Sequence, residues 1–236
     1  MLLKQFLLDE FRFLTFKAPS AAIRENGGAY IALGLFVTWL AGVGRYWDSP
    51  NALLWQYLGL SSLTYVFLLA LVIWVTVLPL GPRNWSYRNV LLFVTLTAPP
   101  ALLYAIPVEL FLPSSVAHAV NSAFLAIVAS WRVALLSVFL KRVAGLRGVT
   151  ILVAALLPLA FIVDGIALMD LQHVVYQNMV GLHEPDELSE DRGHSVASTI
   201  CSTAAILTPV LLAAYVWTVR RAAMYRVRLT ETGSAT

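Results

Sequence analysis

Six long apolar runs limit what this chain can fold into. They cover residues 29–47, 53–79, 89–112, 116–140, 149–171 and 195–219. Their lengths are close to the ~20 residues with which an α-helix crosses about 30 Å of hydrocarbon. With 59% hydrophobic and 12% charged residues, the composition lies outside the range of soluble globular domains. We therefore expect an all-α, polytopic transmembrane helical bundle of about six spans, with a single membrane domain over residues 29–219.

The segments that flank these runs are predicted to lie in the interface or in water. In residues 2–16 the apolar side chains cover a little more than half of a helical wheel, although Glu10 and Lys17 intrude. This pattern favours an interfacial amphipathic helix, which with its linker takes up residues 1–28. Residues 172–194 are predicted to form an acidic outer loop, and residues 220–236 a basic tail.

The distribution of Lys and Arg predicts the orientation. One side of a six-span arrangement carries Lys4, Arg12, Lys17, Arg24, Arg83, Arg88, Lys141, Arg142, Arg147, Arg220, Arg221, Arg226 and Arg228. The opposite side carries only Arg45 and Arg192, and Arg132 lies within an apolar run. Because basic loops stay on the cytoplasmic side, both termini are predicted to be cytoplasmic.

Arg132 is the most unusual residue of the apolar runs. A charge near the centre of a membrane helix costs about 2.5–3.5 kcal/mol on insertion scales, so it needs a partner or water. His118 and Asn121 fall on the same helical stripe as Arg132. Asp164, in the next run, is a candidate partner. Three roles are open: a structural pair of Arg132 with Asp164, snorkelling of Arg132 toward the inner surface, and a substrate or ion pathway lined by either residue.

A second candidate group lies nearer the outer face. It consists of Glu109, His118, Asn121, Asp170 and His173. Carboxylates beside imidazoles suit a proton relay or a cation site, but these residues also mark predicted helix ends, where contact with water explains them. Within the third run, Pro99, Pro100 and Pro107 remove backbone donors, so this helix is expected to be kinked or broken.

Signatures of chemistry are weak in this sequence. The histidines and carboxylates of the loop 172–194 match no metal-binding spacing, so we expect a hydrated loop and no metal or cofactor. The single cysteine, Cys201, rules out an intrachain disulfide. No nucleophile elbow or phosphate-binding loop is present, and we expect no enzymatic activity. The net charge of +3 is explained by membrane orientation and predicts no nucleic-acid binding.

The stretch from Tyr87 to Leu159 resembles the Yip (Ypt-interacting protein) family of small polytopic membrane proteins. The resemblance lies in Tyr87-Arg88-Asn89-Val90, in Ala98-Pro99 within a helix, in the basic stretch 141–148 and in Leu157-Pro158-Leu159. It implies a helical bundle without catalytic residues, linked in eukaryotes to Rab GTPases. The family's typical bundle has five spans, one fewer than we expect here. The excess of Arg over Lys is typical of bacteria, where a Rab partnership does not apply.

These features together predict a non-enzymatic protein of the bacterial inner membrane that organises the membrane or binds partners. Its expected partners are the lipid bilayer and either further copies of the chain or other membrane proteins. The alternative is a small transporter or channel for an ion or small molecule, with a polar pathway at the kinked third helix, Asn121, Arg132 and Asp164.

Overall fold

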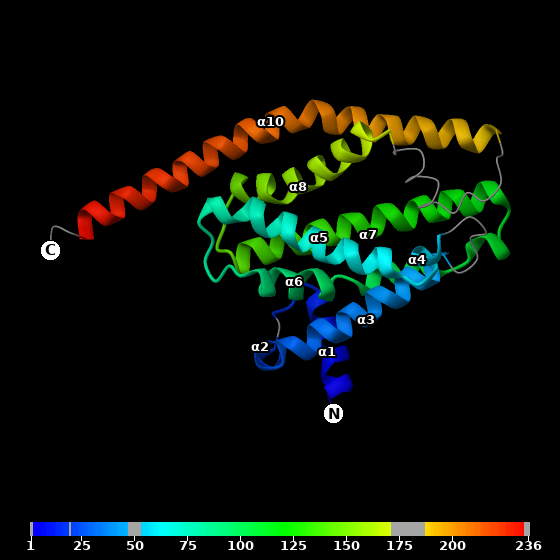
Figure 1. Ribbon diagram of the computed structural model, residues 1–236, viewed down its shortest axis with the longest axis horizontal. Helices are drawn as coiled ribbons and strands as arrows, with labels where there is room; N and C mark the ends of the chain where they lie inside the picture. Colours follow the sequence, from blue (N-terminus) through cyan, green and yellow to red (C-terminus); the bar gives the residue numbers. More distant parts are fainter. Residues whose placement is uncertain (1, 19, 47–52, 171–186, 234–236) are drawn as a thin grey trace. The chain divides into compact units, whose positions relative to one another are not determined.

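The structure is a computed structural model that describes residues 2–18, 20–46, 53–170 and 187–233 (Figure 1). All regular structure in these ranges is helical. The chain forms two compact units, which are described separately. The described part of the first unit comprises residues 2–18, 20–46, 53–71 and 86–138, and that of the second comprises residues 72–85, 139–170 and 187–233.

Five helices are long and apolar enough to cross a membrane. The candidate spans are Gly27–Gly44, Leu60–Leu80, Ala119–Arg142, Val149–Leu168 and Ser198–Met224. They lie in α3 (Gly27–Tyr46), in α5 (Leu60–Val77) with η1 (Leu78–Leu80), in α7 (Ser114–Arg142), in α8 (Val149–Leu168) and in α10 (Glu187–Gly233). These apolar helices are those of a membrane protein, as the sequence predicts. The third apolar run is not among the candidate spans.

The third run is an α-helix that changes into 3-10 helix at its prolines. α6 (Tyr87–Leu96) is followed by η2 (Pro99–Ala105) and η3 (Val108–Leu110), and Pro107 precedes η3. Proline lacks a backbone N–H and its ring clashes with the preceding turn, which explains why the α-helix ends before Pro99. The third run, residues 89–112, is therefore not a single continuous α-helix.

Glycines of α3 set the register between α3 and this broken segment. Gly27 faces the side chain of Arg88, Gly34 faces Thr95 and Gly44 faces Ala105. A Cβ atom added at Gly34 would lie 2.7 Å from that of Thr95, and one added at Gly44 would lie 2.6 Å from that of Ala105. The two members of each pair are 61 positions apart, so the segment from Arg88 to Ala105 runs parallel to α3 along almost its whole length.

The N-terminal helix α1 (Leu2–Leu14) also belongs to the first unit and runs across the direction of α3 (Figure 1). It is followed by the short helix α2 (Ala21–Glu25). The ring of Phe6 packs against that of Tyr30, and Phe13 meets Phe93 of α6 edge-on. In α7, Trp131 donates a hydrogen bond from its indole N–H to the carbonyl of Leu14 at 3.0 Å. The predicted N-terminal helix is thus docked on three other helices of its unit.

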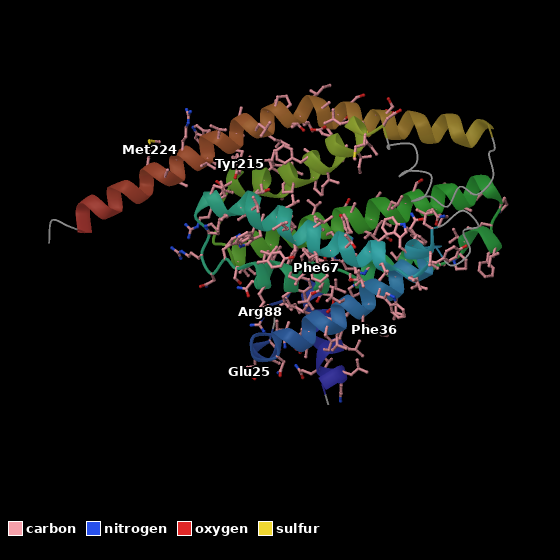
Figure 2. The ribbon with its side chains drawn as sticks, viewed as in Figure 1. Glu25, Phe36, Phe67, Arg88, Tyr215 and Met224 are labelled. Atoms are coloured by element: carbon pink, nitrogen blue, oxygen red, sulfur yellow. The ribbon has the colours of Figure 1, made fainter. Side chains whose placement is uncertain are left out.

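The connection between α3 and α5 holds a short helix, α4 (Leu54–Tyr57). Gly59 follows with a φ of 67°, in the left-handed region that favours glycine. Its neighbour Leu58 accepts a hydrogen bond from the indole of Trp39. On α3, the side chains of Phe36, labelled in Figure 2, and Trp39 are 53% and 37% exposed. Large apolar side chains on the outside of a helix suit contact with lipid.

In the second unit, α10 packs along α8 and η1. The less exposed residues of α10 lie along one side of the helix: Cys201, Ala204, Thr208, Leu211, Ala214, Tyr215, Thr218, Val219 and Ala222. Such a seam of mostly small or polar residues lets membrane helices approach closely. Large apolar side chains, such as that of Met224, stand away from the helix (Figure 2).

Near the C-terminus, helix extends beyond the predicted sixth run at both of its ends. α10 begins at Glu187, so the last part of the predicted loop 172–194 is helical, while residues 171–186, with His173, lie outside the described residues. The same helix continues to Gly233, so most of the predicted basic tail 220–236 is helical.

Candidate functional site

Arg132 lies where the proline break leaves a backbone carbonyl without its usual donor. In a continuous helix the N–H of Ala101 would bond to the carbonyl of Thr97, but here it bonds to Ala98 at 2.8 Å. The Nε of Arg132 donates to the freed Thr97 carbonyl at 3.0 Å. An unsatisfied carbonyl in hydrocarbon costs several kcal/mol, so this bond stabilises the break. The structure therefore links Arg132, through Thr97, to the start of the proline break, which the sequence presented as a separate feature.

Asp164 has a partner in the second unit. Its Oδ2 accepts a hydrogen bond of 2.5 Å from the hydroxyl of Thr208 on α10. Asp164 is half-buried on α8, and Thr208 belongs to the seam through which α10 packs on that helix. Arg132 and Asp164 belong to different units, and each has a hydrogen-bond partner within its own.

The other predicted polar residues are spread over several elements. His118 and Asn121 lie in α7, where Asn121 is half-buried, and Glu109 lies in η3. Asp170 follows α8 with an exposed side chain and a φ of 53°. Among the residues that the structure describes, no group of three or more His, Cys, Asp or Glu side chains is placed to hold a metal ion.

A carboxylate cluster on α1 was missed by the sequence analysis. Asp9 has no exposed surface, and its Oδ2 accepts three hydrogen bonds: from the Tyr30 hydroxyl at 2.6 Å, the Ser20 hydroxyl at 2.8 Å and the Gln5 amide at 3.1 Å. Burial by itself raises the pKa of this carboxyl. The three hydrogen bonds and the nearby charge of Arg12 outweigh burial, so the pKa lies below its ordinary value of 3.8. Asp9 is therefore ionised at neutral pH.

Glu10, the next residue, has the opposite environment. Its side chain is 5% exposed, and neither carboxyl oxygen has a hydrogen-bond partner among the described residues. Burial raises the pKa of Glu10 from its ordinary 4.5 to about 8. The carboxyl is thus mostly protonated at neutral pH. The sequence did contain a signal, because Glu10 interrupts the apolar side of the helical wheel, but periodicity alone does not distinguish a defect from a buried acid.

Comparisons with known proteins identify no relatives: no family model, no curated protein and no solved structure matches the chain. The resemblance to the Yip family therefore stays a prediction. The fold defines the class of this protein, which is a membrane protein with several apolar helices.

Proposed function

We propose that this chain is a non-enzymatic, six-span protein of a bacterial inner membrane that organises the membrane or binds partner proteins there. The observation that carries the proposal is the hydrogen bond from Arg132 to the Thr97 carbonyl. The Nε of Arg132 closes a gap in the helix backbone, which gives this intramembrane cation a structural role that needs no substrate. The hydrogen bond between Asp164 and Thr208 likewise gives Asp164 a role in helix packing that needs no substrate.

Six crossings are supported by the register of the third run. As a ten-residue α-helix and a seven-residue 3-10 helix, α6 and η2 together reach about 29 Å at ~1.5 and ~2.0 Å per residue. That length is close to the ~30 Å of a bilayer core. Their parallel course along α3, a candidate span, supports the same depth for both. With six crossings both termini lie on one side, and the basic residues favour the cytoplasm.

Partner binding is supported by the surface of α10. Within its span Ser198–Met224, only Ala204 and Thr218 are buried. The remaining circumference is mostly apolar and includes Ile206, Val210 and Trp217. In a bilayer such a surface contacts lipid or another transmembrane helix, including that of a second copy.

Cysteine accessibility tests the proposal against a transporter or channel. In a Cys201→Ser background, we expect Asn121→Cys and Asp164→Cys to be protected from a small, membrane-impermeant thiol reagent. Ile127→Cys, at an exposed apolar position in the middle of α7, is the lipid-facing control, and Lys141→Cys, at the exposed end of α7, is the water-facing control. Labelling of both Asn121→Cys and Asp164→Cys at the rate of Lys141→Cys would overturn the proposal in favour of a water-filled pathway.

A further inference from the structure

The helix α1 separates its charges by sign. It carries four charged residues, and both carboxylates, Asp9 and Glu10, are buried against the unit. Both cations, Lys4 and Arg12, are exposed. Burying two carboxylates is costly unless they are hydrogen-bonded or protonated, and a helix that only had to pack would more easily turn them outward to water. The outer surface of α1 is consequently free of negative charge.

The exposed surface of α1 consists of two adjacent helical stripes. Leu3, Leu7 and Phe11, four residues apart, form an apolar stripe in which each side chain is at least 58% exposed. Lys4, Leu8 and Arg12 form the second stripe, with a leucine between two cations. Leucine and phenylalanine beside basic residues are the side chains that interfacial helices insert into a lipid surface. The long stems of Lys4 and Arg12 allow their charges to reach the headgroups while Leu8 is immersed.

The contacts of α1 place it at the end of a span. Asp9 bonds to Tyr30, which lies in the first turn of the candidate span Gly27–Gly44, about 5 Å from its start at ~1.5 Å per residue. Amphipathic interfacial helices lie with their apolar face roughly 5–10 Å into the boundary of headgroups and acyl chains. The depth, the apolar stripe and the positive charge thus all fit the headgroup region of a bilayer.

We infer that the outer face of α1, made by Leu3, Lys4, Leu7, Leu8, Phe11 and Arg12, binds the anionic lipids of the leaflet in which the chain begins. The inference rests on the proposed membrane location and adds a lipid class as the partner. Positive charge on an apolar, interfacial surface attracts anionic headgroups, which Asp9 and Glu10 would repel if they faced outward. Because both carboxyls are buried, they do not weaken the attraction between the cations of α1 and the anionic headgroups.

Lipid-selective quenching tests the inference in the full-length protein. In a Cys201→Ser background, Leu8→Cys carries an environment-sensitive fluorophore, and the protein is placed in vesicles of phosphatidylcholine with phosphatidylglycerol. A nitroxide on the acyl chain of one lipid or the other reports which lipid surrounds the label. We expect stronger quenching by phosphatidylglycerol, with a preference that falls about fivefold for each of Lys4→Gln and Arg12→Gln, because each basic residue contributes about 1 kcal/mol at an anionic surface.

The controls separate lipid binding from a general loss of structure. Lys4→Arg with Arg12→Lys keeps the charges and should keep the preference, and Lys141→Gln, which removes an exposed charge elsewhere, should not change it. Equal quenching by the two lipids would overturn the inference, as would quenching by aqueous iodide without quenching by lipid. Neither result would alter the thiol labelling at Asn121 and Asp164, so the two proposals fail separately.

Discussion

Arg132 shows how a single side chain compensates for a broken helix. Its Nε bonds to the Thr97 carbonyl, which a continuous α-helix would have satisfied through its own backbone. A hydrogen bond between membrane helices contributes about 0.6 kcal/mol on average and up to about 1.7 kcal/mol. The bond is therefore worth less than the cost of placing arginine in hydrocarbon, and the guanidinium charge must also reach polar surroundings.

The Arg132 bond can be tested with two neutral substitutions. Glutamine places a side-chain N–H donor at the same number of bonds from Cα as the Nε of arginine, whereas methionine has a similar length and no donor. We expect Arg132→Gln to unfold in detergent at a higher temperature than Arg132→Met, by a difference equivalent to about 0.6–1.7 kcal/mol. Equal destabilisation by the two variants would mean that the charge, not the hydrogen bond, matters.

Glu10 should make the docking of α1 depend on pH. The docked carboxyl has a pKa of about 8, against an ordinary 4.5, so the docked state holds the proton more tightly. The stabilisation from this group is complete below pH 4.5 and is lost as the pH rises to about 8. Asp9 acts oppositely, because its lowered pKa means that stability is lost only in acid, below 3.8. Two other ionisable groups interact electrostatically with these carboxyls: Tyr30 interacts with both, and Arg12 interacts with Asp9.

Hydrogen exchange of residues 2–14 measures this effect. In the wild-type protein we expect the free energy of opening α1 to fall between pH 5 and pH 8, after correction for the intrinsic exchange rate. Glu10→Gln removes the ionisation and should abolish this fall. Glu25→Gln changes an exposed carboxyl on α2 nearby (Figure 2) and serves as the control that leaves the pH dependence intact. A fall that persists in Glu10→Gln would assign it to another group.

At the scale of elements, side-chain donors satisfy the carbonyls near helix ends. The hydroxyl of Tyr215 bonds to Thr76 at 2.7 Å, and the indole of Trp85 bonds to Trp74 at 3.1 Å, both near the end of α5. The indoles of Trp39 and Trp131 do the same at the ends of α4 and α1. Aromatic residues near helix ends are usually explained by their affinity for the interface. Here they also supply donors to backbone groups that the ends of helices leave open.

The sequence predicted the helices better than it predicted their contacts. Apolar length indicated the membrane helices, and the prolines indicated that the third run is interrupted. The hydrogen bond between Arg132 and Thr97 joins residues 35 positions apart, and no local pattern encodes that distance. The burial of Glu10 was hidden for a related reason, because one face of a helical wheel does not reveal which side meets protein and which meets lipid.

The close contact of α3 with α6 depends on Gly34. A Cβ there would lie 2.7 Å from the Thr95 Cβ and 3.0 Å from the Thr95 backbone, so the two elements would have to separate. We expect Gly34→Ala to lower the unfolding temperature of the protein in detergent, despite the higher helix propensity of alanine. Gly28→Ala, where nothing lies within 4 Å, is the matched control and should be neutral or stabilising, by at most about 1 kcal/mol. If Gly34→Ala and Gly28→Ala changed the unfolding temperature equally, the contact between Gly34 and Thr95 would not be tight.

At the scale of the whole molecule, the number of crossings decides where the ends lie. Counting the broken third run gives six crossings and both termini on one side, whereas the five continuous candidate spans alone would put them on opposite sides. We expect a reporter that is active only in the cytoplasm to be active when fused to either end. If a reporter that is active only in the periplasm were active at one end of the chain, the third run would not cross the membrane.

The register between α3 and the broken segment also has a consequence for synthesis. Each glycine of α3 that makes this contact meets a partner made 61 residues later. At roughly 5–20 residues per second, the ribosome needs about 3–12 s to supply that partner. During this interval the glycine side of α3 lacks its partner, and once α3 enters the bilayer the insertion machinery or a lipid chain must occupy the place that α6 and η2 later take.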